Sequence, residues 1–383
     1  MHFELNPQQV ELRDAARKLA QEVFKDKAAR WDREEIFPEE NKKLLCELGY
    51  TGLSVDPQYG GAGLGLVDTY LVIEEIAKVD LATALIVHEQ NVSPRIIATY
   101  GPEAMRAKLI PKFVSGELEC SIAWTEPQAG SDAANISTTA VREGDEYVIN
   151  GQKVFTTYGD RAHLHLVYAR FGPSKGARGV GTILVPKDSP GLTVRKLPYK
   201  MGVRGASENE LFFDNVRVPA ENVVTLGDPQ NSKGFVAPLT VYNATRVGMG
   251  VMALGVAEGA FELARDYMKV RSQFGQLLSE MQGLRWLMAD MWIEIEAARS
   301  LCYRALAAID AGKPDPCLSS VAKVQATEMA LKTTLQCQQM FGGYGYFGLL
   351  PLERMVRDVR MLTITGGTNQ TQKNAIANHI FGS

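Results

Sequence analysis

The sequence has no excess of basic residues, no long apolar run and only a few cysteines. Its 383 residues include 41 Lys and Arg against 44 Asp and Glu, a formal net charge of −3. Proteins that bind the phosphate backbone of nucleic acids usually have an excess of basic residues, so we expect no nucleic-acid partner. The apolar run Val247–Ala257 is about half as long as a bilayer requires, so we expect no membrane span. Glu4 and Glu11 stand too early for a secretion signal.

The cysteines are widely spaced and form no Cys-x-x-Cys pair; they are Cys46, Cys120, Cys302, Cys317 and Cys337. No histidine pattern accompanies them, so we expect no zinc or other metal site. Scattered cysteines of this kind are typical of buried, reduced thiols in a reducing compartment. We therefore expect a cytoplasmic protein.

The remaining composition, 45% hydrophobic and 22% charged, is that of a globular protein and excludes disorder, collagen and a disulfide scaffold. The length favours two or three domains with a large core. Changes in periodicity divide the chain into three. We predict an α+β fold with an N-terminal helical domain (1–118), a middle antiparallel β domain (119–231) and a C-terminal four-helix-bundle domain (232–383).

Helical spacing dominates the first and last segments. Asn6 before Pro7 is typical of a helix N-cap. Further helices are predicted at 39–48, 68–77, 82–99 and 102–114, and then at 234–270, 279–311 and 318–341. The last three are too apolar on one face to stand alone, so we expect them to pack against the first segment.

The middle segment alternates polar and apolar side chains with a period of two, and prolines interrupt it. The clearest runs are 146–150, 164–168, 181–185 and 210–213. Such short alternating runs are typical of an antiparallel sheet.

The glycine-rich loop Gly60–Gly65 could cradle a phosphate, as such loops do in dinucleotide-binding proteins. It lacks the preceding strand that this fingerprint requires. We therefore interpret the loop as a turn that links two helices.

Five motifs distinguish this chain from a generic globular sequence. They are Ala123–Asp132, Asn150–Thr157, Lys200–Ser207 with Val218–Pro219, Arg271–Gly275 and Gln339–Gly345. In order and spacing the series resembles the acyl-CoA dehydrogenase family over essentially the whole chain. The resemblance implies one FAD per subunit, held between the β domain and the C-terminal bundle, with a CoA thioester beside it. It also implies a homotetramer or homodimer and an electron-transfer flavoprotein as electron acceptor.

The resemblance assigns the flavin site residue by residue. Trp124 and Phe155 are aromatic faces suited to flank the isoalloxazine ring, and Thr125 and Thr157 supply donors to its polar edge. The family usually has tryptophan at the position of Phe155, so stacking is kept but the indole donor is lost. Ser131 is placed beside the flavin and the CoA chain, where small neighbours allow close approach; a plain turn serine is the alternative.

A second set is assigned by the resemblance to the adenosine-diphosphate half of the FAD in a neighbouring subunit: Arg271, Gln273, Phe274, Gln339, Gly343, Thr368 and Gln370. An arginine suits a pyrophosphate because its planar fork donates two hydrogen bonds. A solvated arginine at a helix end is the alternative for Arg271. Tyr242 and Arg246 match positions that line the CoA channel.

The family's general base is missing from both of its usual positions. The glutamate of a Glu-Gly-Thr turn is replaced by Gly366, and the alternative position before Arg246 is Thr245. Neither can take a proton, and losing a positioned base typically costs about 100- to 10,000-fold in rate. The thioester clamp survives, because the N–H of Gly366 and a ribityl hydroxyl of FAD can still bind the carbonyl oxygen.

Three alternatives follow. The first is oxidation of a ring or unsaturated acyl group, as in relatives that oxidise alicyclic, cyclohexene-type carboxyl-CoA esters, with the base moved to the cavity floor. The family builds that floor partly from the helix at 82–99, where this chain offers His88, Glu89 and Asn91. We favour Glu89 as the base and place His88 second. A solvated glutamate and a packed histidine are the structural alternatives.

The second alternative is redox-neutral removal of sulfinate from a sulfinopropionyl-CoA, as in relatives with a similar Gly-Gly-Thr turn. Such an anion needs an arginine, and the first one after Leu81 is Arg95. The third is an enoyl-CoA reductase or a flavin-carrying partner protein, since the direction of electron flow is set by redox partners. We favour the first, an FAD-dependent dehydrogenase of an alicyclic or conjugated acyl-CoA.

Overall fold

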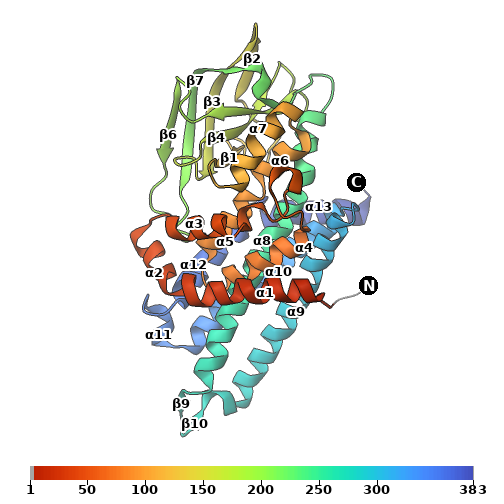
Figure 1. The fold of residues 1–383 in the computed structure, drawn as a ribbon. Coiled ribbons are helices and arrows are strands. Elements are labelled where there is room, and N and C mark those ends of the chain that lie inside the picture. The colour runs from red at the N-terminus through yellow and green to blue at the C-terminus, as the bar shows by residue number, and fades with distance from the viewer. Residues whose placement is uncertain (1–3, 383) are drawn as a thin grey trace.

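The computed structural model describes residues 4–382 and has three parts (Figure 1). A β sheet lies at one end of the molecule, and the long C-terminal helices extend to the other end. The N-terminal helices, red to orange in Figure 1, lie across the region where these two parts meet. The predicted α+β architecture is confirmed.

The N-terminal part is built of helices: α1 (Pro7–Leu19), α2 (Lys25–Glu34), α3 (Glu39–Glu47), α4 (Leu66–Ala77), α5 (Leu81–Gln90), α6 (Ser93–Tyr100) and α7 (Glu103–Val114). The predicted N-cap is confirmed. The side chain of Asn6 accepts a hydrogen bond from the backbone N–H of Gln9 at 2.9 Å, and the Gln9 side chain accepts from the Asn6 N–H at 3.1 Å. This reciprocal pair satisfies two backbone donors at the start of α1.

The prediction of one helix over 82–99 is wrong. The chain forms α5 and α6 instead, with a break after Gln90. Pro94 explains the break, because a proline inside a helix lacks the N–H and its ring clashes with the carbonyl four residues earlier. Asn91 closes α5 by donating from its side-chain amide to the Val87 carbonyl at 2.7 Å.

The middle part contains β1 (Cys120–Ala123), β2 (Thr139–Glu143), β3 (Glu146–Thr157), β4 (Leu164–Arg170), β5 (Val180–Pro186), β6 (Leu192–Lys196), β7 (Glu208–Pro219) and β8 (Val223–Thr225). They form one sheet in the order β6-β7-β3-β2-β4-β5-β8, with β1 beside β4. Most pairs are antiparallel as predicted, but β4 runs parallel to both β1 and β2. Parallel pairing is possible because the intervening β2–β3 hairpin and its loops supply the long connection that it needs.

The C-terminal part contains α8 (Lys233–Met268), the short hairpin β9 (Ser272–Gln273) and β10 (Gln276–Leu277), α9 (Gln282–Asp310), α10 (Pro316–Met340), α11 (Gly343–Tyr346), α12 (Leu352–Leu362) and α13 (Asn369–Phe381). By length and composition α8 could cross a membrane, but 83% of its apolar window is buried inside the protein. It packs against α4, α9 and α10. We therefore interpret α8 as the central core helix.

The glycine-rich loop Gly60–Gly65 links two helical elements, as predicted. It ends at the N-terminus of α4, where backbone N–H groups would attract an anion. The protein's own carboxylate takes that place: Asp310, at the end of α9, accepts from the N–H of Leu66 at 2.8 Å and of Val67 at 3.0 Å. These donors are thus already engaged, and Asp310 joins the start of α4 to the end of α9.

The cysteines are free thiols, and Cys120, Cys302 and Cys337 are buried. Burial raises the pKa of Cys120 and of Cys337 to about 12. Since the thiolate is the reactive form, these two are inert at neutral pH.

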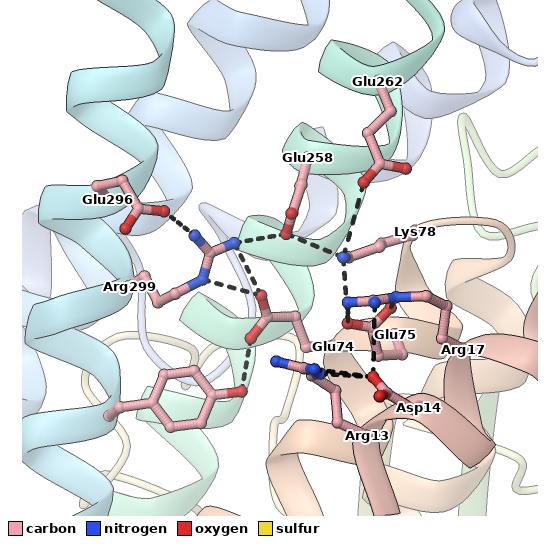
Figure 2. A network of polar contacts seen from close by, with 11 residues as sticks. Arg13, Asp14, Arg17, Glu74, Glu75, Lys78, Glu258, Glu262, Glu296 and Arg299 are labelled. Atoms are coloured by element: carbon pink, nitrogen blue, oxygen red, sulfur yellow. Dashed lines mark hydrogen bonds and ion pairs between the residues drawn. The ribbon is translucent and has the colours of Figure 1, made fainter. Parts of the chain in front are cut away.

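A network of ion pairs fastens the N-terminal helices to the C-terminal bundle (Figure 2). Arg299 on α9 lies 3.2 Å from Glu74 on α4 and also pairs with Glu258 on α8. Lys78 joins Glu75 and Glu258, each at 3.1 Å. Because these side chains are largely buried, losing one partner would leave an uncompensated charge, which is costly. The network thus fixes α4, and α5 after it, relative to α8.

Candidate active site

The three domains meet around the C-terminal end of α5. The Tyr70 hydroxyl of α4 lies 3.2 Å from Nδ1 of His88 and donates to the Ala244 carbonyl of α8 at 3.4 Å. On the sheet side, the Ser93 hydroxyl of α6 donates to the Cys120 carbonyl of β1 at 2.7 Å. The predicted floor residues are therefore enclosed by elements of all three domains.

His88 is fully buried and poorly suited to take a proton. Its Nδ1 faces Tyr70, and its Nε2 has no hydrogen-bond partner. Burial lowers the pKa of His88 to about 4, because an imidazolium here would lack solvent. Asn91 is also committed to the fold, since its amide donates to Val87 and accepts from the Ser54 hydroxyl at 3.1 Å. This geometry favours the packed-histidine alternative.

Glu89 follows on the same helix and differs from His88 in exposure, in hydrogen bonding and in the direction of its pKa shift. It is half-buried, and no described residue forms a hydrogen bond or ion pair with its carboxyl. Burial, together with the charge of Glu208, raises the pKa of Glu89 to about 8. Burial and then the charge of Glu89 raise the pKa of the Tyr242 and Tyr158 hydroxyls, so the carboxyl lies within electrostatic reach of α8 and of the end of β3. A free carboxyl with a pKa near neutrality suits a general base.

A bulge near the C-terminal end of β3 precedes Thr157 and contains Phe155. Phe155 has a φ of 56°, in the left-handed region, and the β3–β7 register shifts between Lys153 and Thr156. The Phe155 residue is 65% exposed there. The Thr157 hydroxyl donates to the carboxyl of Glu208 at 3.1 Å. The bulge thus supplies a bare aromatic face and an oriented hydroxyl.

Trp124 is partly covered by the protein itself. Its indole stacks on Tyr168, with 4.3 Å between ring centroids, and meets Phe235 and Tyr242 edge to face. Its Nε1 donates to the Ala133 carbonyl at 3.0 Å. One indole face is therefore occupied, and contact with a flavin stays a prediction for the remaining surface.

A buried ion pair that sequence reasoning missed supports these residues. Lys153 donates from Nζ to Glu126 at 2.7 Å and to the Trp124 carbonyl at 3.0 Å. Glu126 also accepts from the N–H groups of Ser137 at 2.6 Å and Thr138 at 2.9 Å. Although burial acts to raise it, Lys153 and these donors lower the pKa of Glu126 to about 2. The available signal was that Lys153 is the one basic residue in the two motifs Ala123–Asp132 and Asn150–Thr157.

The loop after Trp124 has free donors and open space. The Thr125 carbonyl accepts from the Val154 N–H at 2.8 Å, which fixes the loop on β3. Ser131 is exposed, and the hydroxyls of Thr125 and Ser131 bond to none of the described residues. A Cβ built on Gly130 would meet nothing within 4 Å. A ligand can therefore approach this backbone closely.

A lysine of α10 holds the turn that carries Gly366. Gly366 and Gly367 have φ values of 66° and 88°. Lys323 of α10 donates from Nζ to the Gly367 carbonyl at 3.0 Å and to Asn369 at 2.7 Å. A Cβ on Gly366 would lie 3.9 Å from the Cα of Arg246, so the turn is adjacent to α8. Burial, and then the charge of Arg246, lowers the pKa of Lys323 to about 7.

Thr245 and Arg246 lie on α8 beside this turn. The Thr245 hydroxyl is buried without a partner. Arg246 donates to the Asn243 side chain at 3.0 Å, while its Nε is buried and unpartnered. Within the described residues, neither Arg246 nor Lys323 forms an ion pair, although the charge of Glu328 acts to raise the pKa of Lys323. This region therefore holds two basic side chains without a close carboxylate partner.

A second cluster lies at the far end of α10. Arg271, Gln273, Gln339 and Gly343 line one cavity of about 640 Å³. Phe274, at the tip of the β9–β10 hairpin, is 95% exposed and does not line it. The structure therefore brings four of these assigned residues together.

Thr368 and Gln370 lie apart from that cavity, at the start of α13. The Thr368 hydroxyl accepts from the Thr371 N–H at 3.2 Å and so caps the helix. Gln370 is exposed. Within one chain these two residues do not share the cavity of Arg271, and their contact with a cofactor stays a prediction.

The residues present fit an FAD molecule. Phe155 offers an uncovered ring, and a Cβ on Gly342 or Gly343 would meet nothing within 4 Å. The Arg271 guanidinium forms no ion pair within the described chain, so it is free to bind a pyrophosphate.

Three protein-family descriptions match the chain in order. They are the N-terminal domain of acyl-CoA dehydrogenase over residues 6–117, its middle domain over 121–216 and its C-terminal domain over 232–381.

Characterised relatives of the chain act on CoA thioesters in different ways. A short-chain specific acyl-CoA dehydrogenase of Clostridium acetobutylicum is 37% identical over 100% of both chains. An acryloyl-CoA reductase (NADH) of Anaerotignum propionicum is 37% identical over 100% of this chain and 96% of its own. A 3-sulfinopropanoyl-CoA desulfinase of Paraburkholderia xenovorans is 41% identical over 99% of this chain and 97% of its own.

Solved structures share the whole fold. Butyryl-CoA dehydrogenase from Megasphaera elsdenii has a TM-score of 0.94 and 33% identity over 100% of both chains. A chain from work on the electron transferring flavoprotein of Acidaminococcus fermentans has a TM-score of 0.95 and 33% identity over 100% of both. A glutaryl-CoA dehydrogenase from Mycobacterium smegmatis, in complex with FADH2, has a TM-score of 0.93 and 26% identity over 99% of this chain and 96% of its own. With these matches and this site, the chain belongs to the acyl-CoA dehydrogenase family and is an FAD-dependent oxidoreductase.

Proposed function

We propose that this enzyme oxidises an alicyclic or conjugated acyl-CoA ester and that Glu89 is its catalytic base. The observation that carries the proposal is a free carboxyl on the floor helix combined with the absence of one at both usual positions, Gly366 and Thr245. Of the two floor candidates, Glu89 with a pKa of about 8 is a far stronger base than His88 with a pKa of about 4.

The place of Glu89 bears on the substrate. A base on α5, rather than at the Gly366 turn, would take a proton from a carbon other than the one next to the thioester. In a ring or conjugated acyl group such a hydrogen is acidic, because the negative charge that develops can reach the thioester carbonyl. This favours a cyclohexene-type substrate over a straight saturated chain.

Separate residues of the chain accept the proton, bind the thioester oxygen and line the path of the CoA chain. A Glu89 oxygen accepts the C–H proton, and FAD, when bound, supplies the acceptor for the hydride. The Gly366 N–H is a donor for the thioester oxygen, held in place because Lys323 clamps the turn. Tyr242 and Arg246 line the approach of the CoA chain, and Ser131 stands at the loop where both ligands would pass.

A redox-neutral desulfinase is the second candidate, and the basic side chains that lack an ion-pair partner favour it. Arg246 and Lys323 lie at the Gly366 turn without a carboxylate partner in the described chain, and an anionic acyl terminus would compensate them. Arg95 is also half-buried and forms no ion pair. The relative at 41% identity is a desulfinase of this kind. An enoyl-CoA reductase differs only in the direction of electron flow.

We further propose a cytoplasmic homotetramer that passes electrons to an electron-transfer flavoprotein. Exposed apolar side chains of α9 and the hairpin support the assembly, because soluble monomers rarely leave so many uncovered: Phe274, Trp286, Trp292 and Ile293. A neighbouring subunit would then bring its Arg271 and Phe274 to the FAD.

The test is anaerobic mixing of the purified enzyme with straight-chain, alicyclic, cyclohexene-type and sulfinyl acyl-CoA esters. Flavin bleaching by the cyclohexene-type or alicyclic esters, with oxidised thioester products, is the expected result. Bleaching by straight-chain esters alone contradicts the proposal. Sulfite release from the sulfinyl ester without bleaching would establish the desulfinase instead.

A further inference from the structure

Glu208 is a largely buried acid that has no part in the proposed reaction. It is the first residue of β7 and lies directly opposite Thr157, the last residue of β3. Side chains of directly opposed residues project to the same face of a sheet. The Thr157 hydroxyl lies 3.1 Å and 3.3 Å from the two carboxyl oxygens of Glu208.

The surroundings of Glu208 bring its titration close to neutrality. Burial raises the pKa of Glu208 to about 7, against the opposing effects of Lys200 and of the Thr157 hydrogen bond. Lys200 lies 3.7 Å away, but it donates to the Ala206 carbonyl and so does not form a close pair. The other charged or titratable groups facing Glu208 are Asp160 after β3, Tyr158, and Glu89 on α5.

A hydroxyl has one hydrogen to donate and two lone pairs to offer. When Glu208 is ionised, its carboxylate accepts the Thr157 hydrogen, and the hydroxyl presents only lone pairs elsewhere. When Glu208 is protonated, it can itself donate to the Thr157 oxygen. The Thr157 hydrogen is then free to point to another acceptor.

We propose that Glu208 is a positioning residue that sets the direction of the Thr157 hydroxyl and thereby switches the hydrogen bond offered to the polar edge of the flavin. The inference rests on the place of Thr157 at the flavin. It is independent of which ester the enzyme takes as substrate.

The same strand offers a matched control. Glu210 is two residues further along β7, on the same face, and is paired with Arg195. It also accepts from the Gln152 side chain at 3.2 Å. Glu210→Gln removes a carboxyl from the same strand without touching Thr157.

The experiment is a pH titration of the visible absorption spectrum of the oxidised holoenzyme, without substrate. Wild type and Glu210→Gln should show a spectral transition with a midpoint near pH 7. Glu208→Gln and Thr157→Val should lose it, while Thr157→Ser, which keeps the hydroxyl, should retain it. FAD content measured in each sample confirms that the spectra describe loaded, folded enzyme.

Two results would overturn the inference, and they are distinguishable. If Thr157→Val changes the spectrum but Glu208→Gln keeps the transition, Glu208 does not orient the hydroxyl. If Thr157→Val leaves the spectrum identical to wild type at every pH, Thr157 does not lie at the flavin. Neither result bears on which ester bleaches the enzyme, so failure here is separate from failure of the proposed function.

Discussion

Glu89 and His88 are neighbours on α5, yet burial shifts their pKa values in opposite directions. Removing water disfavours the charged form of each, so the acid becomes harder to ionise and the imidazole harder to protonate. The pKa of Glu89 rises to about 8, and that of His88 falls to about 4. The sequence shows both residues on one helix, but the difference in base strength arises from packing against three domains.

The pH dependence of turnover should report the state of Glu89. A base must be deprotonated to act, so kcat/KM for the best ester should rise with pH through a midpoint near 8, the pKa of Glu89. Initial rates across this range, with an electron-transfer flavoprotein or a dye as acceptor, provide the measurement. A profile that is flat between pH 6 and 9 would argue against a base with this pKa.

Restoring a glutamate should work better at position 245 than at 366. Gly366 has a φ of 66°, and a Cβ there would stand 3.3 Å from the Met249 side chain. An L-residue in that conformation costs about 1–2 kcal/mol. Thr245 lies in the regular helix α8 and has a buried hydroxyl without a partner. The rate of butyryl-CoA oxidation by Thr245→Glu should therefore be at least tenfold higher than the rate by Gly366→Glu. Equal rates for the two variants would show that backbone strain at position 366 does not matter.

At the scale of elements, sequence patterns predicted most helices and strands, and their failures have physical causes. The Pro94 break could have been predicted, because proline is incompatible with a helix interior. The bulges in β3 could not, since each one shifts the alternation by a residue and changes which side chains share a face. Glu208 was missed for a simpler reason: the predicted strand covered only 210–213, whereas β7 begins at Glu208.

The Glu126–Lys153 pair should be a stability determinant of the middle domain. Lys153→Met leaves the Glu126 carboxylate buried without its cation, which should cost about 3 kcal/mol and lower the denaturant midpoint. Lys196→Met, at an exposed lysine of β6, serves as the matched control and should change stability by less than about 0.5 kcal/mol. Adding Glu126→Gln to Lys153→Met should recover part of the loss; equal midpoints for Lys153→Met and the control would show that the pair contributes nothing.

At the scale of the whole molecule, long-range contacts determine the site, and these were beyond sequence reasoning. The ion pairs of Arg299 and Lys78 join α4, α8 and α9, as Figure 2 shows. Asp310 holds the start of α4 from the end of α9. Such partners lie far apart in the chain, and charge patterns alone do not identify them. The motifs, by contrast, predicted the family, the fold and the cofactor.

Assembly should depend on the apolar surface of α9. We expect light scattering to give a particle of four 42.0 kDa chains. Trp286→Glu combined with Ile293→Glu should dissociate it, because both side chains are more than 60% exposed in the single chain and would carry charge into an interface. Val141→Glu, at an exposed apolar residue of β2, should leave the mass unchanged. A wild-type enzyme that is a monomer at micromolar concentration would contradict the proposed assembly.

The central claim, that Glu89 is the catalytic base, is tested most directly by single-turnover flavin reduction in three enzymes. Wild type, Glu89→Gln and His88→Gln are mixed anaerobically with the ester that bleaches wild type best, and the bleaching rate is followed. We expect Glu89→Gln to lower that rate at least about 100-fold with FAD content and ester binding unchanged, and His88→Gln to lower it far less. Undiminished bleaching by Glu89→Gln would contradict the claim.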